Sequence, residues 1–336
     1  MNRLRTALLG LSGAGADYLQ ALRADEQFEL VAIGDPDVEL LRRVVQGTGA
    51  RGYEDLRSLI VEQSREPLQA LVVALEPPAS PELLLIAAQR GLPVFLKPPA
   101  ARTFAELAKL TAGFAAAGCP LIVARPWSAE PAFALLREPG AGVGHLCHAT
   151  AQIRVPLPPL AGWAGDAARA GGGVLLHGAY ELIDLLVGTL GVPAQLWAQR
   201  SLAVPPGMPR SYDTEDAVVV GMVLPGGATA ALSACRASEV RTAHWSLRLL
   251  GSAGSLDVSP SGLLVESVEP GHGTSVPVHT TKPIAPALGA FGAALRAGIT
   301  PTESAAAAHL PTLAVIETAY LSARTGAPET PARLLR

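Results

Sequence analysis

Short apolar runs alternate with amphipathic segments along the first third of the chain. The apolar runs, which predict buried parallel strands, lie at residues 7–9, 28–33, 68–75, 91–96 and 120–123. The segments with apolar residues at helical spacing lie at 13–23, 38–45, 53–61, 81–90 and 103–117. Strands that alternate with helices in this way predict a doubly wound parallel sheet over residues 1–125.

The pattern changes after residue 125. Apolar and polar positions alternate, as in antiparallel strands, at residues 144–155, 194–202, 217–223, 228–233 and 244–250. Two further helices are predicted at 173–188 and 312–323, and the second should pack back against the body. We therefore expect an α/β protein with two domains, residues 1–125 and residues 126–336.

Composition supports two domains and excludes two classes of partner. The chain has 336 residues, and 49% of them are hydrophobic, which is enough for two cores. A net charge of -3 gives no basic surface for nucleic acid. No run of about 18 apolar residues predicts a membrane span. Because the first strand begins almost at Met1, no signal peptide is expected, and we expect a cytoplasmic protein.

The cysteines predict neither disulfides nor a metal site. Cys119, Cys147 and Cys235 are widely spaced and odd in number. His145 and His148 flank Cys147, but neighbouring side chains of an alternating strand point to opposite faces. We therefore expect no metal ligands in this chain.

A glycine loop, Gly10-Leu11-Ser12-Gly13-Ala14-Gly15, connects the first strand to the first helix. Such a strand–loop–helix unit, with Gly10, Gly13 and Gly15, is typical of a Rossmann fold that binds a dinucleotide diphosphate. A plain structural turn is the alternative. Ser12 replaces the second glycine of the usual motif; its Cβ costs clearance, but its hydroxyl could donate to a phosphate oxygen.

Asp35 ends the second apolar run, 20 positions after Gly15. A carboxylate there accepts hydrogen bonds from the adenosine ribose and repels a 2'-phosphate, which favours NAD over NADP. A second reading is an Asp-Pro turn in which Pro36 opens the next helix. Since parallel strands end at one edge, residues 75–78 and 97–99 should share this rim, and Glu76 and Pro77 are expected cofactor contacts.

Further segments join the glycine loop and Asp35 in a common pattern: residues 53–56, 91–94, 99, 171–184, 215–217, 250–256 and 320–326. Together with residues 10–15 and 35, these segments resemble the glucose-fructose oxidoreductase and inositol dehydrogenase (Gfo/Idh/MocA) family. The resemblance implies an N-terminal Rossmann domain and a C-terminal α/β domain with an open, mainly antiparallel sheet. It also implies a small-molecule substrate and a homodimer or homotetramer formed through that sheet.

The resemblance fails at the family's catalytic positions. Pro98 occupies the lysine position of the family's E-K-P motif, and Lys97 the glutamate position. A shift of one residue should aim Lys97 away from the site unless the backbone bulges. His177 and Glu181 stand where the family has Asp and His. Glu76 and Ser128 likewise replace a threonine and an arginine.

His177, Glu181 and Asp184 are spaced to share one face of the predicted helix. An imidazole beside a carboxylate can exchange the proton of a hydroxyl group, although a local polar contact is the alternative. Lys97 is a third catalytic candidate, with a solvated strand-end lysine as its alternative. Tyr180 lies beside this face, where a buried structural role is favoured.

These observations favour an NAD(P)-dependent oxidoreductase that acts on CH–OH groups of a sugar, a polyol or a related hydroxyl or keto compound. The alternative is a catalytically inactive family member that binds NAD and serves as a sensor or partner subunit. The combined replacement of the family's lysine, aspartate and histidine motivates that alternative.

Overall fold

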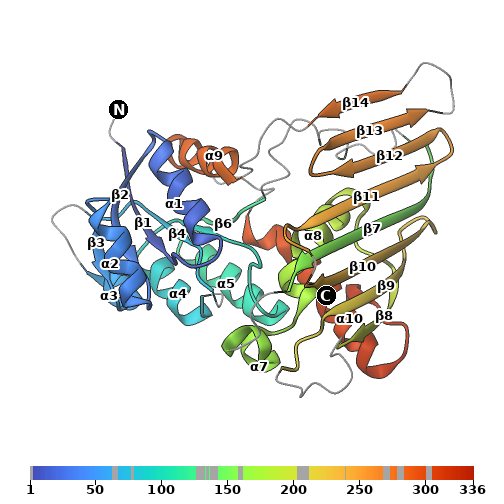
Figure 1. The fold of residues 1–336 in the computed structure, drawn as a ribbon, viewed down its shortest axis with the longest axis horizontal. Coiled ribbons are helices and arrows are strands. Elements are labelled where there is room, and N and C mark those ends of the chain that lie inside the picture. The colour runs from blue at the N-terminus through green and yellow to red at the C-terminus, as the bar shows by residue number, and fades with distance from the viewer. Residues whose placement is uncertain are drawn as a thin grey trace. The chain divides into compact units, whose positions relative to one another are not determined.

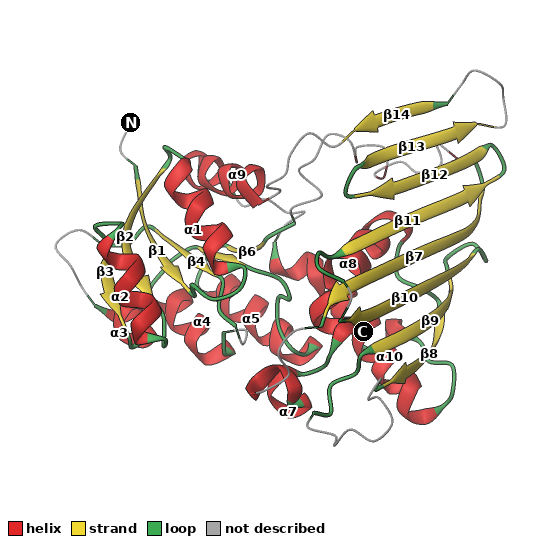
Figure 2. Ribbon diagram, viewed as in Figure 1, coloured by secondary structure: helices red, strands yellow, loops and turns green. Residues whose placement is uncertain are grey.

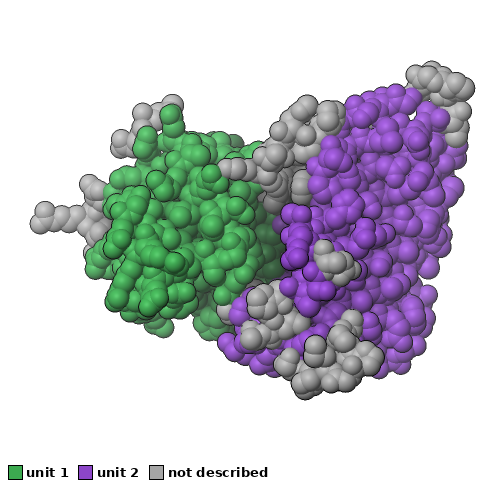
Figure 3. All heavy atoms as spheres, in the orientation of Figure 1, with its two compact units in different colours: residues 1–101, 105–129, 281–309 green, residues 102–104, 130–280, 310–336 purple. Residues whose placement is uncertain are grey.

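The chain forms two units, each with a sheet of its own (Figures 1 and 3). The computed structural model describes residues 3–62, 67–76, 79–125, 133, 136, 143–157, 162–202, 212–238, 240–267, 273–277, 284–299 and 305–336. Unit 1 comprises residues 1–101, 105–129 and 281–309, and unit 2 comprises 102–104, 130–280 and 310–336. A boundary at residue 125, as expected from the sequence, would place residues 281–309 in the second domain. In the structure these residues belong to unit 1.

Unit 1 is built on a six-stranded parallel sheet of order β3-β2-β1-β4-β5-β6. Its strands are β1 (Leu4–Leu9), β2 (Phe28–Gly34), β3 (Arg51–Tyr53), β4 (Ala70–Val73), β5 (Val94–Leu96) and β6 (Leu121–Val123). The connecting helices are α1 (Gly15–Ala24), α2 (Val38–Gln46), α3 (Leu56–Val61), α4 (Pro81–Gln89) and α5 (Phe104–Ala116). The apolar runs are buried, as parallel strands covered on both faces require. The expected doubly wound sheet is confirmed.

Helix α9 (Ile284–Ala297) adds a segment to unit 1 that the sequence pattern did not predict. Phe291 packs on Phe95 of β5, with ring centroids 5.2 Å apart. The Gln27 side chain donates to the carbonyl of Gly289 (3.1 Å). This helix contains two glycines and has its proline in the first turn, and the low helix propensity of glycine explains why the sequence pattern did not reveal it.

Unit 2 contains an eight-stranded sheet of order β14-β13-β12-β11-β7-β10-β9-β8, antiparallel except between β7 and β10. The strands are β7 (Leu146–Pro156), β8 (Gln195–Ser201), β9 (Ala217–Val223), β10 (Thr229–Ala237), β11 (His244–Gly251), β12 (Gly254–Ser259), β13 (Gly262–Ser267) and β14 (Thr274–Pro277). The expected open, mainly antiparallel sheet is confirmed, and β12 to β14 extend it beyond the strands predicted.

Helices cover one face of this sheet, and no helix of the described residues covers the other, here called the open face (Figure 2). Side chains of α8 (Tyr180–Leu190) and α10 (Leu310–Thr325), among them Ile183 and Val315, meet Val220 and Leu232 of the sheet. On the opposite face, the side chains of Trp197, Val219 and Val223 are 40–51% exposed.

The helix predicted at 173–188 is divided into two pieces. A π-helical turn, η4 (Val174–Gly178), precedes α8, and the Ala179 N–H donates to the carbonyl five residues back. The chain bends by 60° between Ala167–Gly178 and Tyr180–Leu190. No single helix of the described chain is long and apolar enough to cross a membrane. The two parts of this bent pair have that length and apolar character only when they are taken together.

Candidate functional site

The glycine loop joins β1 to α1 by a turn that only glycine permits. Gly10 has a φ of 96°, and a Cβ there would lie 2.6 Å from the carbonyl of Ala74. A Cβ at Gly15 would lie 2.5 Å from the carbonyl oxygen of Gly10. Side chains at these positions would force the loop away from β4 and from its own helix.

Three consecutive amides of this loop have no acceptor in the part of the chain that the structure describes. Within the described residues, the N–H groups of Ser12, Gly13 and Ala14 donate no hydrogen bond. Ser12 and Gly13 are exposed, and α1 begins at Gly15 without a side-chain cap. Successive free N–H groups at a helix N-terminus bind anions. The loop therefore has the donors that a dinucleotide diphosphate requires.

Asp35 ties the glycine loop to the end of β2. Its Oδ2 accepts from the N–H of Leu11 (2.7 Å), and its Oδ1 accepts from the N–H of Asp37 (2.8 Å). The residue is only 3% exposed. Helix α2 begins at Val38 with Asp37 as its N-cap, so Pro36 precedes the helix and does not occupy its first position as expected. Asp35 thus positions the loop, and further acceptor capacity remains on the same carboxylate.

Glu76 and Lys97 form an ion pair at the rim of unit 1. Lys97 Nζ lies 3.1 Å from Glu76 Oε1, and the two side chains are 18% and 30% exposed. A Cβ built at Gly13 would overlap the Glu76 carboxylate, so Glu76 lies against the glycine loop. The expectation that Lys97 points away is wrong, because Lys97 follows the last residue of β5 and no longer obeys strand alternation. Pro77 lies outside the described residues, as does Ser128.

His177 and Glu181 lie in unit 2, on either side of the break between η4 and α8, and both are half-buried. Their expected α-helical spacing does not hold, because η4 is a π turn. Asp184 is buried and accepts a hydrogen bond from the Thr312 hydroxyl (2.7 Å). Asp184 therefore links α8 to α10, and its expected place on a polar face with His177 is wrong. Tyr180 is buried, as expected.

The His177 ring is held by its own unit. Its Nε2 lies 2.9 Å from the carbonyl oxygen of Ala170, and the ring meets Trp163 edge-on, with centroids 5.3 Å apart. A carbonyl oxygen only accepts, so we assign the hydrogen of the neutral ring to Nε2. Nδ1 is then the acceptor, which is the form that a general base needs.

Glu215 anchors the turn that carries His177. Its carboxylate accepts from the N–H groups of Gly173 (2.8 Å) and Leu175 (3.0 Å) and from the phenol of Tyr320 (2.8 Å). The residue is 1% exposed. A carboxylate at the start of a helical segment satisfies N–H groups that have no partner within the helix. A buried charge thus fixes the start of η4.

Two neighbours complete this network. Burial and the adjacent Glu215 charge raise the pKa of Tyr320 well above its ordinary value of 10.0, so the phenol stays protonated and donates. The Arg236 guanidinium donates to the carbonyl oxygen of Glu215 (2.6 Å) and lies 3.1 Å from Asp216 Oδ1. A Cβ at Gly173 would overlap the Glu215 backbone, which accounts for glycine there.

Sequence reasoning did not assign a site role to Glu215, Arg236 or Tyr320. They come from three distant segments, and no spacing rule connects them. The available signal is the run Gly171-Gly172-Gly173, because consecutive glycines ahead of a helix indicate that another backbone or a large side chain packs closely there.

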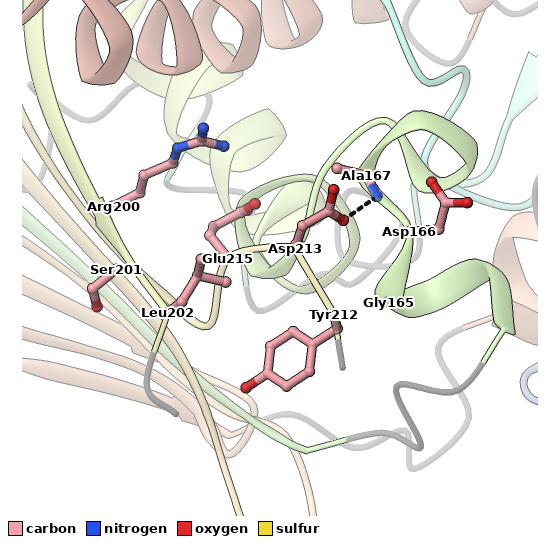
Figure 4. A pocket seen from close by; sticks show the side chains of 9 residues that line it. All are labelled: Gly165, Asp166, Ala167, Arg200, Ser201, Leu202, Tyr212, Asp213 and Glu215. Atoms are coloured by element: carbon pink, nitrogen blue, oxygen red, sulfur yellow. Dashed lines mark hydrogen bonds between the residues drawn. The ribbon is translucent and has the colours of Figure 1, made fainter. Parts of the chain in front are cut away.

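A cavity of about 820 Å³ lies in unit 2 (Figure 4). It is lined by Gly165, Asp166, Ala167, Arg200, Ser201, Leu202, Tyr212, Asp213 and Glu215. Asp213 accepts from the N–H of Ala167 (2.6 Å), and Arg200 has no ion-pair partner among the described residues. The segment 162–170, which contacts His177 through Trp163 and Ala170, also forms one wall of this cavity.

The part of the chain that the structure describes contains no group of three His, Cys, Asp or Glu side chains placed to hold a metal ion. In the segment from His145 to His148, Cys147 Sγ lies 3.6 Å from the carbonyl oxygen of His145. His148 Nδ1 lies 2.8 Å from the hydroxyl of Thr229.

Comparison with known families gives two matches that together span most of the chain. Residues 4–125 match the GFO_IDH_MocA profile, described as an oxidoreductase family with an NAD-binding Rossmann fold. Residues 141–257 match the GFO/IDH/MocA C-terminal domain. The first matched region contains the strands of the unit 1 sheet. The second contains strands β7 to β11 of the unit 2 sheet.

Two curated relatives and one solved structure extend the comparison. A D-apiose dehydrogenase of Paraburkholderia graminis is 32% identical over 133 residues, which are 39% of this chain and 35% of that protein. The chain thus matches about a third of that relative's length. A putative UDP-kanosamine synthase oxidoreductase subunit of Amycolatopsis mediterranei is 26% identical over 76% of this chain and 75% of that protein. A levoglucosan dehydrogenase in complex with NADH and L-sorbose shares the fold, with a TM-score of 0.86, 18% identity and coverage of 99% and 100%.

Proposed function

Because the chain belongs to the GFO/IDH/MocA family of oxidoreductases, we propose that it oxidises or reduces a sugar, a polyol or a related hydroxyl or keto compound with NAD. The observation that carries this proposal is the cradle of three amides at Ser12, Gly13 and Ala14, which have no acceptor among the described residues. Their donors fit a diphosphate at the start of α1. Similarity to a D-apiose dehydrogenase and a levoglucosan dehydrogenase supports a carbohydrate-like substrate.

The glycine loop and Asp35 hold NAD in this proposal. The loop amides and the Ser12 hydroxyl donate to the diphosphate, and the remaining lone pairs of Asp35 accept from the adenosine ribose. A 2'-phosphate would approach a carboxylate that is already fixed by two backbone amides. The resulting repulsion disfavours NADP.

NAD, when bound, supplies the hydride acceptor or donor, and the protein must exchange the hydroxyl proton. We assign the exchange of this proton to Nδ1 of His177, because Nε2 donates its hydrogen to the carbonyl oxygen of Ala170. Glu181 is half-buried near the start of α8 and would stabilise a charged imidazole. Lys97 is the second candidate for this role, since its ammonium lies at the rim that carries the glycine loop.

We assign the cavity of unit 2 to the part of the substrate that does not react. Carboxylates accept hydrogen bonds from hydroxyl groups, and the Arg200 guanidinium donates to them. The cavity therefore offers both kinds of partner to a polyhydroxylated molecule. Its volume lies within the range of small-molecule sites.

The first test is a screen of aldoses, polyols and sugar acids with NAD, followed by NADH absorbance. We expect turnover of at least one compound, with kcat lowered about 10²-fold or more in His177→Ala. His244→Ala, an exposed histidine on β11, is the control and should leave kcat unchanged. Full turnover by both His177→Ala and Glu181→Gln would remove this pair from the reaction.

A second candidate function is an NAD-binding sensor or partner subunit without turnover. The burial of Asp184 against Thr312 favours it, because one carboxylate expected near the reacting groups has a structural contact instead. The two functions give different results in the same assay. Robust NADH-dependent turnover above background eliminates the inactive member, whereas NAD binding without turnover across the panel supports it.

We propose that the open face of the unit 2 sheet joins copies of the chain into a homodimer or homotetramer. Trp197, Val219 and Val223 make this face apolar and exposed. Light scattering should give a mass above 34.6 kDa, which Val219→Asp should lower towards the monomer. Val61→Asp, at an exposed valine of unit 1, is the matched control. A monomeric wild type would contradict this assignment.

A further inference from the structure

A negatively charged side chain, Glu76, lies beside the glycine loop that is proposed to bind a diphosphate. The Glu76 carboxylate lies so close to Gly13 that a methyl group at Gly13 would overlap it. The carboxylate takes no hydrogen bond from the loop amides; its partner is the ammonium of Lys97, 3.1 Å away. Both side chains are mostly buried, which weakens the screening of their charges by salt.

A bound diphosphate would bring two negative charges to the same loop. Like charges at short range repel, and the repulsion grows as water is excluded. The Glu76 carboxylate and the diphosphate therefore compete for the space beside Gly13. Lys97 reduces the electrostatic part of this conflict, because its ammonium neutralises the Glu76 charge.

We propose that Glu76 is a gate on the cofactor site, closed over Gly13 and opened when its carboxylate turns away with Lys97 as its counter-ion. This inference rests on the proposed NAD site. It assigns to Glu76 the opposite effect from a cofactor contact, because the carboxylate lowers NAD affinity instead of raising it. It assigns Lys97 a positioning role through Glu76.

The test is calorimetric titration of the full-length chain with NAD. Glu76→Gln keeps the size of the side chain and removes the charge, so NAD should bind about tenfold more tightly at low salt. The gain should shrink only slightly as ionic strength rises, because burial of the Glu76 and Lys97 side chains weakens screening by salt. Glu76→Ser should also raise the affinity for NAD, and this variant places no side-chain amide near the loop that could itself bind the diphosphate. Glu82→Gln removes the same charge from an ion pair with Lys109, 3.2 Å apart, and should change NAD affinity much less.

A double-mutant cycle distinguishes a positioning role of Lys97, which acts through Glu76, from a direct contact of Lys97 with NAD. Lys97→Met should weaken NAD binding in the wild type, because it leaves the Glu76 charge uncompensated, and should have little effect in Glu76→Gln. The Glu82 and Lys109 pair provides the matched cycle, in which no coupling is expected. Equal weakening by Lys97→Met in both backgrounds would show a direct contact with NAD and overturn the positioning role.

The gate and the proposed function fail differently. If wild type binds NAD and Glu76→Gln binds it equally or more weakly, the gate is wrong and the cofactor site stands. If neither protein binds NAD, both proposals are wrong. If only Glu76→Gln binds, the gate is supported in its strongest form.

Discussion

The phenol of Tyr320 on α10 donates a 2.8 Å hydrogen bond to the carboxylate of Glu215, which in turn accepts from the amides that begin η4. This relationship connects the last helix of the chain to the turn that carries His177. It makes the position of the candidate base depend on a residue more than a hundred positions away in sequence.

Tyr320→Phe should lower the free energy of unfolding by about 2 kcal/mol, because a buried hydrogen bond to a charged group is lost. The raised pKa of Tyr320 adds a pH dependence. Its stabilisation is complete below pH 10, where the unfolded residue is also protonated, and is lost as pH rises above that value. Denaturant unfolding at neutral and alkaline pH measures both effects. An unchanged stability at neutral pH would contradict the network.

Two glycines on either side of His177 should respond oppositely to alanine. At Gly173 a Cβ would overlap the Glu215 backbone, so Gly173→Ala should destabilise the protein by more than about 2 kcal/mol. At Gly188 of α8 a Cβ meets nothing within 4 Å. Gly188→Ala should therefore stabilise by about 0.5–1 kcal/mol, as expected in a helix interior. Equal effects at the two sites would contradict the packing described.

The sequence was informative where one segment determines its own structure. Apart from the short strand β3 and helix α9, the strands and helices of unit 1 followed from local periodicity and spacing, as did the glycine loop with Asp35. The π turn at η4 did not, because Glu215, Arg236 and Tyr320 impose it from outside the segment. The same reason explains why Asp184, placed by spacing on a polar face, is instead buried against Thr312.

At the rim of unit 1, the sequence failed to predict the Glu76–Lys97 ion pair for a different reason. Spacing placed Glu76 and Lys97 at one edge of the sheet, but it could not show that they pair with each other. The direction of Lys97 was wrong because strand alternation was extended one residue past the end of β5. A side chain just beyond a strand is positioned by its partner, and here the partner is a charge.

The cysteines should differ in reactivity with a thiol reagent. Burial raises the pKa of Cys119 to about 11, whereas Cys147 is exposed on β7. The thiolate is the reacting form, so Cys147 should be modified first at pH 8, and Cys119 only as pH approaches 11 or the chain unfolds. Peptide mass spectrometry after timed labelling measures this order. Rapid labelling of Cys119 at pH 8 would contradict its burial.

The central claim is that the amide cradle at residues 12–14 binds the diphosphate of NAD. Ser12→Asp tests it most directly, because Ser12 is exposed and its substitution places a carboxylate in the cradle without disturbing the core. Gln46→Glu adds the same charge at an exposed position of α2 and serves as control. Calorimetric titration should show that wild type and Gln46→Glu bind NAD more tightly than NADP, and that Ser12→Asp loses NAD binding by at least about tenfold. Unchanged NAD affinity in Ser12→Asp would contradict the claim, and so would a lack of NAD binding by both the wild type and Glu76→Gln.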